Sequence, residues 1–472
     1  MSLHRAVAQG TIIQIVGKAI STLLGFVAIA LLTRTLGTEQ FGWYITASSF
    51  LQFVGVLSDF GFVLTTSNML SEGQFERSRL FNTIFTWRGI TAFIFQVLGP
   101  LVFLFFPFQS EIKWAVAIMS ASFFFQSLNQ VFVGLYREQL RIGVAVMGEI
   151  ASRVALVTGV ALVAAGHNGF LWMMGAVSIA SLLSTVYYWL YAPTIHWSTD
   201  RAISAAILAK MWPVATAVIF NSLYFQAGRI ILPFYISQTE VGLFGAAIRV
   251  YDIVVQMAAL IMGILMPLLT FAWARQLKND FKERLQLSLN LMSVLLVPLI
   301  VGLIVLARPL MILVAGTNFT ASGDMLAIIG IALFGVTFGM TFGHVALTIN
   351  RQRSVLWIYI SDAFISFLAF LYVIPHYGWR GAAIIMIFSE LYAGTLITIV
   401  TLRYAKTIPS FVAFFKIVLA SAIMGAVLYL TTSLPLLVAI VLGIITYAVL
   451  IMGLRVMTWE RVRDVLKGPK IA

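Results

Sequence analysis

Eleven charged side chains fall inside apolar runs of this sequence, where an ionised group is unusual. The basic members are Lys18, Arg88, Arg153, Arg229, Arg249 and Lys416. The acidic members are Asp59, Glu149, Asp252, Asp362 and Glu390. An ionised side chain at the bilayer centre costs about 2.5–3.5 kcal/mol even on the lenient insertion scale, so such residues usually face a bundle interior or a watery cavity. The chemistry open to them is anion binding, charge pairing and exchange of a proton or cation.

Arg153 shows the problem most clearly. It lies in "MGEIASRVALVTGVALVAAG" (147–166), four residues after Glu149, so the two share a face of a helix. Counted from Gly143 at about 1.5 Å per residue, Arg153 lies roughly 15 Å into a hydrocarbon layer of ~30 Å. Lys18 belongs to a polar stripe whose other members are Gln14, Ser21, Thr22 and Gly25. One polar face on an apolar helix predicts a protein-lined or wet side.

Structural explanations stay open for several of these charges. Glu149 with Arg153, and Arg249 with Asp252, have the spacing of pairs within one helix. Arg88 lies about seven residues into its run and Lys416 about five, so either stem could extend its charge to the membrane surface. The amides Gln126, Asn129 and Gln130 occupy one helical turn, where helix-to-helix contacts are the more frequent role.

Composition assigns these residues to a membrane protein. The chain has 472 residues, of which 61% are hydrophobic and 10% charged, against about 25% charged in soluble domains. It contains no cysteine, and its five histidines are scattered without metal-ligand spacing. The glycine spacing in "GTIIQIVGKA" does not fit a nucleotide-binding loop. We therefore expect no metal, no resident cofactor, no nucleic-acid partner and no enzymatic activity.

Hydropathy predicts an all-α polytopic protein with about fourteen transmembrane helices. The expected spans are 10–33, 42–66, 81–107, 113–134, 143–165, 169–191, 208–235, 242–271, 285–307, 324–350, 354–375, 380–402, 411–432 and 436–454. With the N-terminus in the cytoplasm, twenty Lys and Arg residues fall in cytoplasmic segments and four in outer ones. This asymmetry predicts that both termini are cytoplasmic.

Internal similarity predicts two lobes. "TEQFGWYITA" (38–47) and "TEVGLFGAA" (239–247) share Gly42 with Gly242 and Ala47 with Ala247. An even number of spans in each unit makes them parallel repeats. The expected organisation is an N-lobe at 1–191 with six spans, a cytoplasmic linker at 192–207, a six-span C-lobe at 208–403, and two further helices with a basic tail at 404–472.

Several stretches resemble a known family. They are "LLTRTLGTEQFGWYITASSFLQFVGVLSDFGF" (31–62), "RSRLFNTIFTWR" (77–88), "VGLYREQLRIGVAVMGEIASRV" (133–154), "GRIILPFYISQTEVGLFGAAIRVYD" (228–252) and "ILVAGTNF" (312–319). Together they resemble the polysaccharide transporter branch, with its O-antigen repeat-unit flippases, of the multidrug/oligosaccharidyl-lipid/polysaccharide exporter superfamily. One departure is Gly228 before Arg229, where relatives often carry an acid.

The resemblance implies a flippase of the bacterial inner membrane. Its substrate would be a lipid-linked oligosaccharide on an undecaprenyl-pyrophosphate-type carrier, moved between leaflets by alternating access through a cationic cavity. Expected anion contacts are Lys18, Arg88, Arg153, Arg229 and Arg249. Candidates for proton or sodium coupling, or for charge pairing, are Asp59, Glu149, Asp252, Asp362 and Glu390. Membrane lipid and other glycan-assembly proteins are expected partners of a monomer.

Three other functions stay open. A multidrug exporter of the same superfamily usually carries cations, which would favour an acidic cavity and about twelve helices. A lipid II flippase would obey the same physics with a different sugar. A membrane glycan polymerase or ligase would need a sizeable outer loop, whereas the outer connections here are short.

Overall fold

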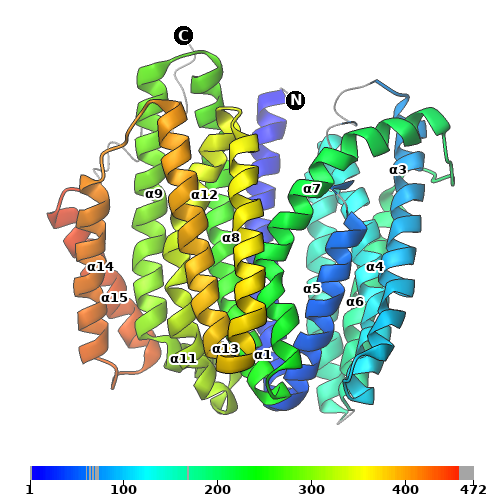
Figure 1. Ribbon diagram of the computed structural model, residues 1–472, viewed down its shortest axis with the longest axis horizontal. Helices are drawn as coiled ribbons and strands as arrows, with labels where there is room; N and C mark the ends of the chain where they lie inside the picture. The colour runs from blue at the N-terminus through cyan, green and yellow to red at the C-terminus, as the bar shows by residue number, and fades with distance from the viewer. Residues whose placement is uncertain are drawn as a thin grey trace. The chain divides into compact units, whose positions relative to one another are not determined.

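The computed structural model describes residues 3–59, 61, 62, 65, 69, 74–166 and 169–456, and the predicted basic tail lies outside them. The described part contains helices and no strand (Figure 1). In chain order the helices are α1 (Leu3–Asp59), α3 (Arg77–Ala92), η1 (Phe93–Leu98), η2 (Gly99–Phe105), α4 (Ser110–Glu138), α5 (Ile142–Ala165), α6 (Phe170–Tyr191), α7 (Arg201–Ile231), η3 (Leu232–Phe234), α8 (Gln238–Ala274), α9 (Lys278–Val305), α10 (Ala307–Ala315), η4 (Thr317–Phe319), α11 (Thr320–Gly330), α12 (Ala332–Thr348), α13 (Gln352–Ala405), α14 (Val412–Leu430) and α15 (Leu436–Gly453).

Most of these helices have the length and apolarity of membrane spans. Within the described residues ten helices qualify, or eleven when η4 and α11 are joined with α12 across a 45° bend. The helices α1 and α13 each contain a break, at Gly37 with φ 67° and at Gly378 with φ 55°. A positive φ is cheap only for glycine, and each break divides a long helix into two helices. The all-helical, many-span fold class is confirmed, and fourteen spans stay a prediction compatible with these helices.

The chain forms two compact units. The first comprises Met1–Gly245 and Val314–Gly316, and the second comprises Ala246–Leu313 and Thr317–Ala472. The division along the chain therefore falls inside α8, after Gly245. The lobe boundaries expected from the sequence remain predictions.

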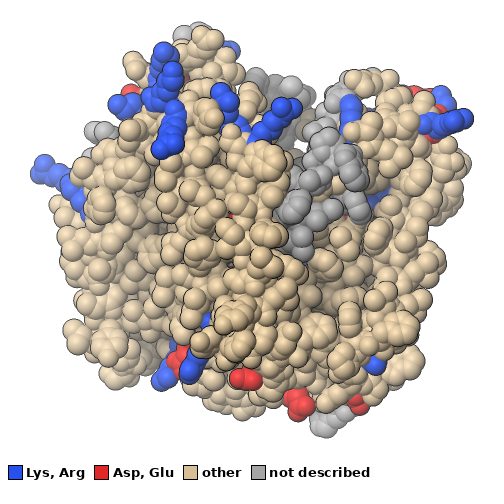
Figure 2. Space-filling model, viewed as in Figure 1, with Lys and Arg blue, Asp and Glu red and all other residues tan. Residues whose placement is uncertain are grey.

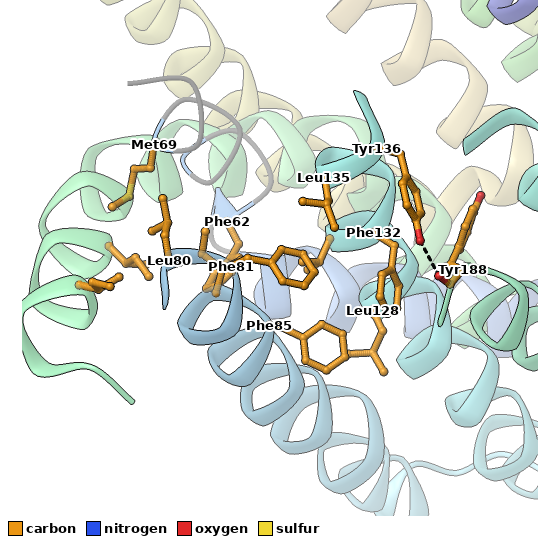
Figure 3. Packing of buried hydrophobic residues seen from close by; sticks show 14 of the residues in the cluster. Phe62, Met69, Leu80, Phe81, Phe85, Leu128, Phe132, Leu135, Tyr136 and Tyr188 are labelled. Atoms are coloured by element: carbon orange, nitrogen blue, oxygen red, sulfur yellow. Dashed lines mark hydrogen bonds between the residues drawn. The ribbon is translucent and has the colours of Figure 1, made fainter. Parts of the chain in front are cut away.

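An aromatic core joins α3, α4 and α6 in the first unit (Figure 3). Phe85 packs against Phe132 with ring centroids 5.3 Å apart, and Phe132 lies 6.2 Å from Tyr188. The Tyr136 hydroxyl donates a hydrogen bond to the Tyr188 carbonyl, drawn as the dashed line in Figure 3. Buried aromatic groups of this kind combine large apolar area with a satisfied polar end. The core fixes α4 and α6 beside the helix that carries Arg88.

The segment between α6 and α7 is extended along α3. The backbone N–H of His196 donates to Asn82 Oδ1 at 3.2 Å, and that of Ser198 donates to Thr86 Oγ1 at 2.9 Å. Asp200 then caps α7 by accepting from the N–H groups of residues 202 and 203. The predicted linker therefore has a defined course within the first unit.

In the second unit, α9 packs against α14 and α15. Tyr447 of α15 donates to the Val294 carbonyl of α9 at 2.9 Å. Lys416, expected to extend to the membrane surface, donates to the Leu454 carbonyl just past the end of α15 at 3.1 Å. A cation there complements the helix dipole. Figure 2 shows basic side chains gathered over the connection between α8 and α9.

The related glycines of the two repeats meet in the first unit. A Cβ added to Gly42 would lie 1.8 Å from the Gln238 carbonyl oxygen, and one added to Gly242 would lie 2.0 Å from that of Thr38. Positions 38 and 42 correspond to 238 and 242 at the offset of the repeat, so the contact is reciprocal. Reciprocity is what a local two-fold axis requires.

Candidate functional site

The first span of α1 turns its polar side away from its exposed side. Leu23 is 65% exposed and Val27 46% exposed, and both lie on the face opposite Lys18. Ser21 is only 3% exposed. Within the predicted polar stripe, Ser21 therefore faces protein, Lys18 is half-buried and Gln14 is exposed.

The helix α5 is arranged in the same way. Its strongly exposed residues, Val154 and Leu162 among them, follow one face. Glu149 and Arg153 lie at least a third of a turn away from that face, and both are half-buried. Gly17 of α1 is covered tightly by Val146 of α5. Because Val146 and Glu149 are neighbours on the α5 surface, this face packs against α1.

Glu149 forms its ion pair with Lys18 instead of Arg153. Lys18 Nζ donates to Glu149 Oε1 at 3.3 Å, across two helices that are 131 residues apart at these positions. Arg153 makes no hydrogen bond or ion pair with the residues that the structure describes. The pairing within α5 that the spacing allowed is therefore replaced by one between helices.

Further unsatisfied groups lie beside this pair. Ser21 Oγ is buried and has no hydrogen-bond partner in the described part of the chain. A Cβ added to Gly25, one turn further along the same stripe, would meet nothing within 4 Å. Lys18, Ser21, Glu149 and Arg153 together form what we call the α1–α5 site. Within the described part of the chain, its guanidinium and its Ser21 hydroxyl have no hydrogen-bond partner, and a Cβ at the nearby Gly25 would meet no atom within 4 Å.

Arg88 has a different environment. It is 1% exposed, so it does not extend to the membrane surface. Its guanidinium donates to the Ser127 carbonyl at 3.2 Å, to the Ser58 carbonyl at 2.9 Å and to Gln130 Oε1 at 2.8 Å. Its Nη2 also lies 3.3 Å from Asp59 Oδ1. A forked cation that meets acceptors from α1 and α4 ties three helices together.

The amides of α4 contact neighbouring helices, as expected. Gln130 accepts from Arg88 of α3. Asn129 Nδ2 donates to Ser184 Oγ at 2.8 Å, and Thr185 Oγ1 donates to Asn129 Oδ1 at 2.8 Å. Polar bonds between membrane helices contribute about 0.6–1.7 kcal/mol each. The prediction of helix-to-helix contacts is confirmed for Asn129 and Gln130, whereas Gln126 Nε2 donates to Ser122 Oγ of its own helix at 3.1 Å.

Acidic groups dominate the polar interior of the second unit. Asp362 is fully buried and accepts from Ser366 Oγ at 2.8 Å and Ser389 Oγ at 2.9 Å. Glu390, adjacent to Ser389 and 7% exposed, accepts from the Tyr251 hydroxyl at 3.4 Å. The bond from Ser389 connects the two halves of α13 on either side of Gly378, whereas Ser366 lies on the same half as Asp362. These serine partners could not be identified from the sequence.

The remaining expected site residues lie on α7 and α8. Arg229 is in the last turn of α7 and half-buried. Arg249 and Asp252 are half-buried, three positions apart on α8. Arg249 lies on the face that carries the exposed Gln256, so this face of α8 is partly polar. Arg229 belongs to the first unit and Arg249 to the second.

Comparison with known proteins places this chain among glycan-assembly proteins. The profile of the polysaccharide biosynthesis protein family matches residues 7–273. The chain belongs to this family. The succinoglycan biosynthesis transport protein ExoT of Rhizobium meliloti (strain 1021) is 25% identical over 345 residues, which are 71% of this chain and 67% of that protein. The family resemblance drawn from the sequence is thereby confirmed.

Solved structures agree on the fold. The lipid II flippase MurJ in an inward closed conformation matches with a TM-score of 0.77 at 15% identity, covering 92% of this chain and 97% of that one. An inward-facing multidrug resistance MATE family transporter of the MOP superfamily matches with a TM-score of 0.66 at 14% identity, covering 82% and 94%. This polysaccharide biosynthesis family member thus has the fold of MOP superfamily membrane transporters.

Proposed function

We propose that the chain is a flippase for a lipid-linked oligosaccharide of the undecaprenyl-pyrophosphate type. It would move the repeat unit from the inner to the outer leaflet by alternating access. Family membership and the transport role named for ExoT support transport in polysaccharide assembly. A flippase needs no covalent step, in agreement with relatives that are named as transporters.

The observation that carries the proposal is that Arg153 has no hydrogen-bond or ion-pair partner among the residues that the structure describes. It lies eleven residues after Ile142, the first residue of α5, which is about 16 Å along the helix. The neighbouring carboxylate, Glu149, is already held by Lys18. A guanidinium at this depth is costly unless it receives an anion. A pyrophosphate supplies charged oxygens that suit the planar donor fork of arginine.

We assign the other expected anion contacts either to substrate binding or to a structural role. We propose Lys18 as a second phosphate contact beside Arg153, with Arg229 and Arg249 as contacts further along the path. For Arg88 we propose a structural role in place of the anion contact expected from the sequence. Its donors already meet three protein acceptors, and it is 1% exposed.

We assign the acidic residues either to charge balance or to ion coupling. Asp59 and Glu149 each contact a cation, so we assign them to charge balance. Asp362 is held by two serine hydroxyls, and we propose it, with Glu390, as the site of proton or sodium coupling. Asp362, whose described partners are two serine hydroxyls, changes charge more easily than a carboxylate that is ion-paired. Asp252 stays a candidate for pairing with Arg249.

We further propose that the protein lies in a bacterial inner membrane with both termini in the cytoplasm. The excess of Lys and Arg in alternate connections supports this orientation. Membrane lipid and the enzymes that assemble the glycan are the expected partners, and a monomer contains all the groups named above.

Export of surface glycan by the Arg153→Ala variant tests the function. We expect export to be lost while the protein level stays near that of the parent. Lys416→Ala is the matched control, because it removes another intramembrane cation that only binds the end of α15. Full export by Arg153→Ala would contradict the proposal. A change in drug resistance without a change in glycan would favour the multidrug exporter instead.

A further inference from the structure

The ion pair of the α1–α5 site is loosely held. Lys18 and Glu149 meet through a single contact of 3.3 Å, and their side chains are 31% and 40% exposed. By contrast, Arg88 near Asp59 is 1% exposed and donates three further hydrogen bonds. A partly exposed single contact is weak and easily exchanged. Glu149 can therefore leave Lys18 without unfolding the unit.

The groups around the pair provide what a second anion would need. Arg153 lies one turn from Glu149 on α5, and Ser21 lies one turn from Lys18 on α1. The Ser21 hydroxyl is buried without a partner, although buried polar groups are normally satisfied. Open space next to Gly25 adjoins these donors along the same stripe. The donors of the site therefore outnumber its one carboxylate.

We propose that Glu149 is an internal countercharge, which occupies Lys18 while the site is empty and is displaced by the phosphate of the substrate. The inference rests on the proposed function and adds an explanation of how the substrate is released. With the site empty, Glu149 keeps Lys18 from being left without an anion at membrane depth. With the phosphate bound, Lys18, Arg153 and Ser21 all donate to the ligand. The return of Glu149 to Lys18 then competes with rebinding and favours release.

Removing the charge of Glu149 separates this role from a structural one. In Glu149→Gln, the phosphate no longer competes with a carboxylate for Lys18. We expect the purified full chain in detergent to bind farnesyl pyrophosphate about two- to fivefold more tightly, the size of one exposed charge interaction. We also expect a lower maximal export rate, because release becomes slow. A purely structural ion pair would give weaker binding or less protein instead.

Matched variants locate the effect. Glu138→Gln removes a surface carboxylate that pairs with Arg77 and should leave binding unchanged. In a Lys18→Gln background the gain from Glu149→Gln should largely disappear, because the two residues act through each other. Farnesol should show no gain, whereas inorganic pyrophosphate should show the same gain as the lipid if the headgroup alone is recognised. Thermal unfolding of Glu149→Gln verifies that the variant is folded.

The results distinguish the two proposals. If Arg153→Ala abolishes binding and export while Glu149→Gln binds no more tightly than the parent, the countercharge is refuted and the flippase stands. If the parent does not bind farnesyl pyrophosphate and Arg153→Ala exports normally, both proposals fail. If Glu149→Gln still binds more tightly in the Lys18→Gln background, the countercharge is also refuted, because Glu149 is proposed to compete with the phosphate for Lys18.

Discussion

Replacing Arg88 by alanine should destabilise the first unit strongly. The change removes donors from the Ser58 and Ser127 carbonyls and from Gln130 Oε1, and it leaves Asp59 without its cation. Three bonds between membrane helices, at about 0.6–1.7 kcal/mol each, amount to roughly 2–5 kcal/mol. Breaking a buried ion pair from one side costs about 3–5 kcal/mol. The two estimates describe overlapping effects, so they are not added.

We expect a loss near the lower end, about 3 kcal/mol in the free energy of unfolding. The reason is that the Asp59 side chain is 22% exposed and can gain some solvation. Arg88→Lys should fall between the parent and alanine, because a lysine keeps the charge but cannot reproduce the planar fork. Unfolding of the purified protein in mixed micelles measures both variants.

Arg153→Ala is the matched comparison for Arg88→Ala. Its side chain makes no hydrogen bond or ion pair with the residues described, so its removal should leave the free energy of unfolding nearly unchanged. Export, however, should be lost. If Arg88→Ala instead unfolds like the parent but fails to export, Arg88 is a substrate contact and the structural assignment is wrong.

Three shorter predictions concern other parts of the chain. Gly242→Val should separate α8 from α1, because even a Cβ would lie 2.0 Å from the Thr38 carbonyl. The chain has no native cysteine, so Thr46→Cys and Gln238→Cys can be crosslinked, and a lower crosslinking yield measures the separation of the two helices. Asp362→Asn should abolish the dependence of liposome transport on an imposed proton or sodium gradient without reducing protein level. The pKa of Asp200 is held below its ordinary 3.8 by the backbone N–H groups of Ile203 and Ala202 and by Arg79. The stability that this cap contributes should therefore be present above pH 3.8 and be lost as the pH falls through the lowered pKa. The free energy of unfolding of Asp200→Asn should lack this pH dependence.

Much of the fold was predictable because hydropathy and helix period depend on local sequence. The polar stripe of Lys18 and the shared face of Glu149 and Arg153 are consequences of 3.6 residues per turn. Both stripes are turned from the exposed faces of their helices, as predicted. The partner of Glu149 was not predictable, because Lys18 lies 131 residues away and spacing within one helix offered Arg153 first.

Other contacts could not be predicted because the partners lie on different helices. Nothing in the sequence near Arg88 shows that two backbone carbonyls and an amide of other helices will surround it. The serine partners of Asp362 are similarly invisible, since one of them is 27 residues away on the second half of α13. The contact between Gly42 and Gly242 is different. Their correspondence in the predicted repeat was visible in the sequence, and the structure brings the two positions together.

Arg88 and Arg153 show why depth and residue type alone do not decide function. Each lies eleven residues after the first residue of its helix, Arg77 or Ile142, so the two have similar positions along their helices. Arg88 is surrounded by acceptors that satisfy a forked cation within the protein. The carboxylate nearest Arg153 along its helix is instead held by Lys18. Because a guanidinium at membrane depth requires acceptors from some source, a substrate anion can supply the acceptors that the described residues do not offer Arg153.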